Sequence, residues 1–150
     1  VLKNKGIKDI KVICAGEGNM LNEIKSYIKE KNLEDNIHML GFRADIDELI
    51  VSCDIGILMS YREGLPRNIM EFMACKKPVI GTNIRGIRDL IQNDINGYLV
   101  NIGNVNETAN TIEKMYIDKQ LLDSIGKSAY ESIQKYSLNK VVDSIKQILV

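Results

Sequence analysis

The alternation of strand-like and helix-like stretches along most of the chain constrains its fold more than any other feature. Residues 10–16 (IKVICAG) form a β-rich run that ends in glycine, and residues 19–33 have the apolar spacing of an amphipathic helix. Further strands are predicted over residues 36–41, 54–60, 77–82 and 96–100, helical segments over 45–53 and 66–76, and a helical turn or two over 85–93. Strands that alternate with crossover helices predict a parallel sheet with helices on both faces.

Details of these segments sharpen the expected fold class. Residues 54–60 (DIGILMS) are almost wholly apolar, which is typical of a strand covered on both faces. Pro66 suits the first position of its helix, where the missing N–H costs nothing. Everything after Asn104 reads as helical, with an asparagine-rich cap at its start and Ser137 as a later N-cap. We expect an α/β, three-layer, Rossmann-like domain with a helical C-terminal tail.

Composition narrows the function. One hundred and fifty residues with 45% apolar content suit a single domain with its own core. Twenty basic and twenty acidic residues leave no basic footprint for nucleic acid, and no apolar run approaches the ~20 residues that span a bilayer. No signal-peptide pattern opens the sequence. The odd, widely spaced Cys14, Cys53 and Cys75 predict buried free thiols, and His38 has no partner at zinc-ligand spacing.

The loops that follow strands are the places to search for a site, because parallel sheets bind ligands at the carboxyl ends of their strands. The loop SYREGLPRN contains Gly64, which lets a ligand approach the backbone closely or permits an unusual φ. Leu65 and Pro66 open a helix whose first N–H groups attract anions. Arg62 and Arg67 are candidate partners for phosphate oxygens.

Two glutamates flank this turn. Glu63 suits two sugar hydroxyls better than a phosphate, and Glu71, further along the helix, suits a ribose diol. Taken alone, however, the loop is better interpreted as a capped helix with solvated acids.

Other strand-following loops are weaker candidates. The AGEGN turn with Gly16 falls short of a dinucleotide-binding fingerprint, and a plain tight turn is the better interpretation. Gly41, Phe42 and Arg43 fit a base-binding platform about as well as a structural glycine beside a half-buried phenylalanine. The arginines of the segment RGIRD fit a solvated helical face equally well.

Taken together, these segments resemble the donor-binding half of retaining glycosyltransferases with the GT-B fold, in glycosyltransferase family 4. The family signature, two glutamates separated by seven residues, is matched by EGLP from Glu63 and EFMA from Glu71. The segments AGEGN, LGFRADIDELI, CDIGILMS, KKPVIGT and NGYLV also match, so the motifs cover residues 10–102. The segments around both glutamates look most like bacterial members that build capsules, exopolysaccharides and O-antigens.

The resemblance implies transfer of a glycosyl unit from a nucleotide sugar, most often a UDP-sugar, with retention of anomeric configuration. It implies that Glu63 binds hydroxyls of the donor sugar and Glu71 those of the ribose. Backbone N–H groups around residues 64–66 would face the diphosphate and sugar, and residues 41–43 would frame the base. No metal or other cofactor is expected, because the helix dipole and basic side chains stabilise the leaving diphosphate.

The chain also departs from the family pattern. The arginine and lysine that bind the diphosphate in the family, and the acceptor-binding domain, have no counterpart here. The usual Gly-Gly and Glu after the PVIGT segment appear as Arg85-Gly86 and Asp89. We therefore expect residues 1–150 to be a donor-binding domain, truncated at its N-terminus and inactive alone. The expected partners are a nucleotide sugar and an acceptor glycan or lipid-linked glycan, in the cytoplasm or at the inner face of the membrane.

Two alternatives stay open beside this transferase reading. One is a non-catalytic module that binds a nucleotide or nucleotide sugar in the same pocket. The other is a flavodoxin-like regulatory domain, which ranks lower because it needs an acidic cluster after the first strand and CAGEGN supplies only Glu17.

Overall fold

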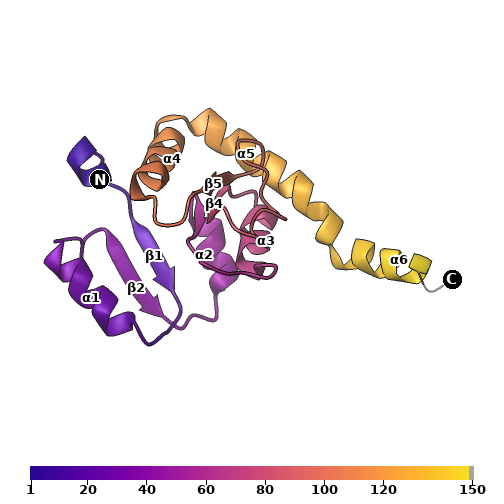
Figure 1. Cartoon of the computed structure of the whole chain (residues 1–150), viewed down its shortest axis with the longest axis horizontal. Coiled ribbons are helices and arrows are strands. Elements are labelled where there is room, and N and C mark those ends of the chain that lie inside the picture. Colours follow the sequence, from indigo (N-terminus) through magenta and orange to yellow (C-terminus); the bar gives the residue numbers. More distant parts are fainter. Residues whose placement is uncertain (149–150) are drawn as a thin grey trace. The chain divides into compact units, whose positions relative to one another are not determined.

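The computed structural model describes residues 1–148, and the chain divides into two compact units. Unit 1 is Val1–Glu48 and unit 2 is Leu49–Val150. Figure 1 labels most of the helices and strands of both. Each unit contains its own parallel sheet, so each is described separately below.

Unit 1 is built around a two-stranded parallel sheet. It contains the 3-10 helix η1 (Leu2–Lys5), β1 (Val12–Ala15), α1 (Leu21–Glu30) and β2 (Ile37–Gly41), and α2 (Ile46–Ser52) begins at its end. The strands pair from Val12 opposite Ile37 to Ala15 opposite Gly41, with a register shift just before Ala15. Ile28 on α1 is the one buried residue of unit 1.

Unit 2 holds a three-stranded parallel sheet in the order β3-β4-β5. Its strands are β3 (Gly56–Leu58), β4 (Val79–Thr82) and β5 (Tyr98–Val100), and α3 (Arg67–Ala74) connects the first two. The chain then runs through α4 (Val105–Ile117), α5 (Lys119–Ile133), η2 (Gln134–Tyr136) and α6 (Leu138–Ile148). Asn104 caps α4 as expected, because its side chain accepts a hydrogen bond from the Glu107 N–H at 3.1 Å.

Helices cover both faces of the unit 2 sheet, which confirms the α/β fold class and its helical C-terminal tail. Neighbouring residues of β4 point to opposite faces, and Val79 and Ile80 accordingly belong to two different core clusters. The Val79 cluster includes side chains from α3 and α5, among them Met73 and Ile133. The Ile80 cluster includes Met115 from α4 and Ile125 from α5.

Two local predictions are corrected by the structure, and a third is refined. The helical turn or two predicted over residues 85–93 remain isolated turns, in which the Ile91 N–H donates to the Ile87 carbonyl at 2.9 Å, and Gly86 has a left-handed backbone with φ of 86°. The strand predicted over residues 54–60 shortens to β3. Because β3 is an edge strand of its sheet, its side chains are less covered, and Ile57 is 43% exposed. Pro66 lies one residue before α3, as its N-cap, because its ψ of 114° is extended.

The cysteine prediction holds in part. All three cysteines are free, but each is half-buried rather than fully buried. Burial raises the pKa of the Cys14 thiol above its ordinary value, so this thiol is a poor nucleophile near neutral pH.

Candidate functional site

The candidate site of unit 2 lies where the parallel strands β3 and β4 end. Ser60 follows β3, and Thr82 is the last residue of β4. The Thr82 hydroxyl donates a 2.5 Å hydrogen bond to the backbone carbonyl of Ser60. This bond joins the ends of the two strands, and it fixes the start of the loop that carries the first glutamate.

Glu63 is held inside this loop by its own side chain. The Ser60 hydroxyl donates a 2.6 Å hydrogen bond to Glu63 Oε1, and both residues are half-buried. A hydrogen bond to a carboxylate is stronger than one between neutral groups, so it restricts the side chain of Glu63. Among the described residues, Glu63 Oε2 has no protein partner. The carboxylate is therefore oriented, with one oxygen available to a ligand.

The turn after β4 supports the glutamate loop from the other side. A methyl group on Gly86 would lie 2.7 Å from the carbonyl oxygen of Glu63 and would also collide with that of Gly64. Only a glycine permits this backbone-to-backbone contact at a left-handed φ. The segment RGIRD, expected to be a helical face, thus packs against the loop EGLP through Gly86.

Glu71 has a different environment from Glu63. It lies on α3, one turn after Arg67, and Arg67 Nη2 is 3.9 Å from Glu71 Oε1. Both side chains are exposed, at 90% for Arg67 and 45% for Glu71. An exposed pair at this distance contributes little to stability. The Glu71 carboxylate is thus accessible to a ligand hydroxyl.

The remaining predicted residues of this loop are divided between surface and core. Arg62 and Leu65 are exposed, while Pro66 is buried and precedes α3. Gly64 is exposed, has no left-handed φ, and has open space where a side chain would be. The structure therefore excludes an unusual φ as the role of Gly64, and the close approach of a ligand stays a prediction.

In unit 1 the structure brings Gly16 and Gly41 together. The Gly16 N–H donates to the Gly41 carbonyl at 2.7 Å, and both glycines have positive φ. Phe42 is 76% exposed, rather than half-buried. The guanidinium of Arg43 binds both carboxylate oxygens of Asp45, with Nε 2.7 Å from Oδ1, and this pair lowers the pKa of Asp45. Arg43 is therefore already engaged by its own loop.

Sequence reasoning missed Ser60 and Thr82, the two hydroxyl residues behind Glu63. The available signal was positional, since one lies three residues before the glutamate and the other at the end of a predicted strand. A hydroxyl at either place is common in turns, and only the folded contacts single these two out.

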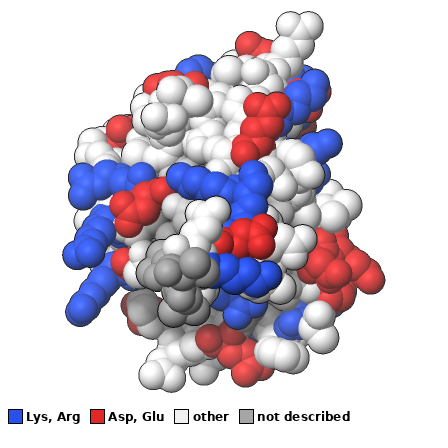
Figure 2. Space-filling model, turned by 90° about the vertical axis from the view of Figure 1, so that its right-hand side faces the viewer, with Lys and Arg blue, Asp and Glu red and all other residues white. Residues whose placement is uncertain are grey.

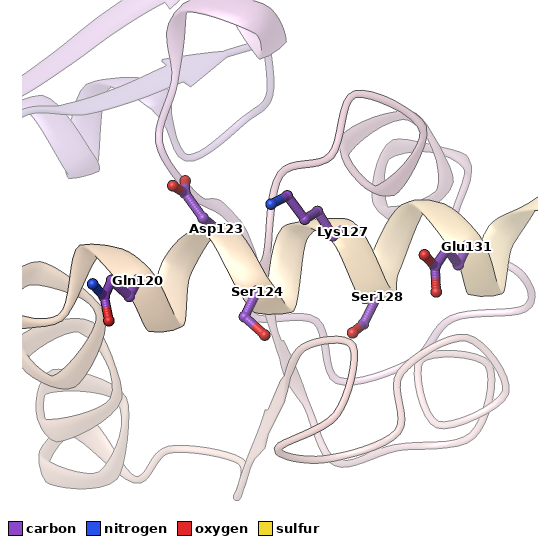
Figure 3. A pocket seen from close by; sticks show the side chains of 6 residues that line it. All are labelled: Gln120, Asp123, Ser124, Lys127, Ser128 and Glu131. Atoms are coloured by element: carbon purple, nitrogen blue, oxygen red, sulfur yellow. The ribbon is translucent and has the colours of Figure 1, made fainter.

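Elsewhere on the part of the surface that the structure describes, we find no second candidate. A shallow hollow along α5 is lined by six polar side chains that all come from this one helix (Figure 3). These are Gln120, Asp123, Ser124, Lys127, Ser128 and Glu131. On the face drawn in Figure 2, basic and acidic side chains are interspersed. Within residues 1–148, no group of three or more acidic, histidine or cysteine side chains is placed to hold a metal. No described helix is long and apolar enough to cross a bilayer.

Comparison with known proteins identifies the family of the chain. The chain is 28% identical over 152 residues to an Escherichia coli protein named UDP-Gal:alpha-D-GlcNAc-diphosphoundecaprenol alpha-1,3-galactosyltransferase, covering 100% of this chain and 39% of that protein. It is 30% identical to the N-acetyl-alpha-D-glucosaminyl L-malate synthase of Bacillus anthracis, over 93% of this chain and 37% of that protein.

A solved structure gives a similar result. The crystal structure of Anabaena Alr3699/HepE in complex with UDP and glucose superposes with a TM-score of 0.89 at 29% identity, covering 95% of this chain and 41% of that one. The chain thus spans about two fifths of the length of these relatives. Residues 1–132 match the family described as "Glycosyl transferases group 1". The chain belongs to this glycosyltransferase family.

Proposed function

We propose that this chain is the donor-binding part of a glycosyltransferase that moves a sugar from a nucleotide sugar, with retention, to a bacterial glycan or lipid-linked glycan. The observation that carries the proposal is the arrangement of the two glutamates. Glu63 is oriented by a hydrogen bond at the carboxyl end of the sheet, and Glu71 is accessible on the following helix. Such paired acceptors suit a ligand with two separate sets of hydroxyls.

The roles of the two carboxylates are those that the family resemblance implies. Glu63 binds hydroxyls of the donor sugar, and Glu71 binds the ribose hydroxyls. Between them, exposed Gly64 lets the diphosphate approach the backbone N–H groups that precede and open α3. The exposed Arg62 and Arg67 add positive charge beside it. The proposal includes no metal ion.

The nucleotide and acceptor are inferred from relatives. HepE structures contain UDP and UDP-glucose, which supports UDP as the nucleotide. The name of the Escherichia coli relative specifies a diphosphoundecaprenol-linked acceptor, which supports a lipid-linked glycan and action at the inner face of the membrane. The whole protein would then be a family 4 glycosyltransferase that takes part in the assembly of a bacterial polysaccharide. Transfer needs an acceptor site, and none is proposed within the described residues.

Calorimetric titration tests the ribose role of Glu71. The chain is titrated with UDP and GDP into the millimolar range, and the Glu71→Ala variant is compared with Glu131→Ala, which removes an exposed glutamate from α5. We expect Glu71→Ala to weaken UDP binding about tenfold, since a charged acceptor of two hydroxyls is lost, and Glu131→Ala to leave it unchanged. A folded chain that binds no nucleotide, or equal affinities in both variants, would contradict the proposal.

The same titration tests one form of the second candidate function, a non-catalytic module that binds the nucleotide alone. Such a module would bind UDP and UDP-glucose equally, since it needs no sugar contact. A donor-binding part gains affinity from the sugar. The half-buried, oriented carboxylate of Glu63 favours the donor-binding part, because a nucleotide alone gives it nothing to bind.

A further inference from the structure

The hydrogen bonds behind Glu63 form a short chain that ends in the core. Ser60 Oγ donates to Glu63 Oε1 at 2.6 Å, and the backbone carbonyl of Ser60 accepts from Thr82 Oγ1 at 2.5 Å. Thr82 is only 3% exposed and belongs to the central strand of the unit 2 sheet. The position of the Glu63 carboxylate is therefore linked through Ser60 to the rigid end of β4.

This linkage has a consequence for ligand binding. A glutamate side chain has three rotatable bonds, and ordering it on binding costs conformational entropy. A carboxylate that already accepts a hydrogen bond has lost part of this freedom before the ligand arrives. Because Oε1 is occupied by the hydroxyl, Oε2 is the oxygen with no protein partner among the described residues. The arrangement selects one carboxylate oxygen for the ligand.

We propose that Ser60 is a positioning residue for Glu63, and that its hydroxyl pre-orients the carboxylate for the hydroxyls of the donor sugar while Thr82 holds Ser60 in place. The inference rests on the proposed function, because it takes the sugar as the ligand of Glu63. It assigns Ser60 to the sugar part of the donor alone, since the Ser60 hydroxyl donates to Glu63, whereas the ribose acceptor Glu71 lies on α3 beside Arg67.

The sugar increment, defined as the Kd for UDP divided by the Kd for the UDP-sugar, measures this role directly. Calorimetry on the whole chain with UDP, UDP-glucose and UDP-N-acetylglucosamine gives the increment for each sugar. In Ser60→Ala we expect the UDP affinity to stay within about twofold, while the increment for the preferred sugar falls about tenfold. Ser60→Thr keeps a hydroxyl and should retain most of the increment.

A second pair of variants tests the link to the sheet. Thr82→Val keeps the shape of the buried side chain but removes the hydroxyl, and we expect it to lower the sugar increment about threefold. Thr82→Ser keeps the hydroxyl and should retain the sugar increment of the wild-type chain. Ser132→Ala is the matched structural control, because Ser132 is also half-buried in unit 2 and hydrogen-bonded, to Asn96 and Ala129. This control should change the unfolding midpoint without changing the sugar increment.

The outcomes separate this inference from the proposed function. If the wild-type chain shows a sugar increment and Ser60→Ala keeps it, the positioning role is wrong while donor binding stands. If Ser60→Ala weakens UDP and UDP-sugars equally, Ser60 acts only on the stability of the loop, and the inference is again overturned. A folded wild-type chain that binds UDP without any sugar increment, or binds no nucleotide, would overturn the proposed donor role itself.

Discussion

At the scale of single residues, the two glutamates of the signature differ in what holds them. Glu63 is half-buried and accepts a short hydrogen bond, whereas Glu71 is exposed beside an exposed arginine. A partly desolvated carboxylate needs a hydrogen bond to offset the loss of water, and Ser60 supplies one. The oriented glutamate suits selection among sugars, and the exposed one suits a contact common to all ribonucleotides.

Gly86 is the residue whose substitution most directly tests how the glutamate loop is supported. Gly86→Ala forces a side chain into a left-handed backbone and against the carbonyl of Glu63. We expect a loss of about 3 kcal/mol in the free energy of unfolding, from backbone strain plus the collision. Urea unfolding followed by circular dichroism measures it.

Gly64→Ala is the matched control, because Gly64 lies in the contacting loop, has no left-handed φ, and has open space around it. Its free energy of unfolding should change by less than about 1 kcal/mol. Equal stability of the two variants would mean that the contact between the two loops does not form in solution.

At the scale of elements, the sequence predicts most of the architecture because apolar periodicity is a local property. The strands ending near Gly16 and Gly41 and the helix containing Glu71 are found where the pattern places them. Residues 85–93 are different, since the backbone of Gly86 is set by its contact with the loop of Glu63. No local pattern contains that contact, so the sequence predicts helical turns here without the left-handed backbone of Gly86.

The candidate site follows the same division. The two glutamates and the glycine turn between them can be predicted from their order in the sequence, because they follow a predicted strand and open a predicted helix. Ser60 and Thr82 are 22 residues apart, and the bond between them depends on the parallel pairing of β3 with β4. The engagement of Arg43 by Asp45 likewise requires the loop conformation. Contacts across elements are the part that sequence patterns leave undetermined.

The packing of α5 on the turn before β4 gives a prediction at this scale. Gly126 lies inside α5, where alanine would ordinarily stabilise the helix by about 1 kcal/mol. Here a methyl group would collide with the carbonyl of Lys76 and lie 3.4 Å from Pro78 Cδ. We expect Gly126→Ala to lower the free energy of unfolding by about 2 kcal/mol, because a backbone collision outweighs the gain in propensity.

Thermal unfolding of Gly126→Ala and Ser124→Ala checks the sign. Ser124 is exposed on the same helix, so its replacement by alanine should raise Tm slightly through helix propensity alone. An increase of Tm in both variants would show that α5 does not approach the Lys76 turn as closely as described.

At the scale of the whole molecule, the buried core is distributed unevenly between the two units. Ile28 is the one buried residue of unit 1, whereas the other buried apolar side chains belong to unit 2. Stability follows buried apolar area, so the two units should differ in how often they open. Gly41, Phe42 and Arg43 belong to unit 1, and both glutamates belong to unit 2.

Native-state hydrogen exchange tests this difference. We expect the amides of β4 and β5 to exchange only through global unfolding, and those of β1 and β2 to exchange at least about tenfold faster, since opening unit 1 exposes little core. Low urea distinguishes the two routes, because a partial opening has a smaller dependence on denaturant than global unfolding. If the amides of β1 and β4 share one protection level and one urea dependence, the units unfold together, and the residues expected to frame the base are as stably placed as the glutamates.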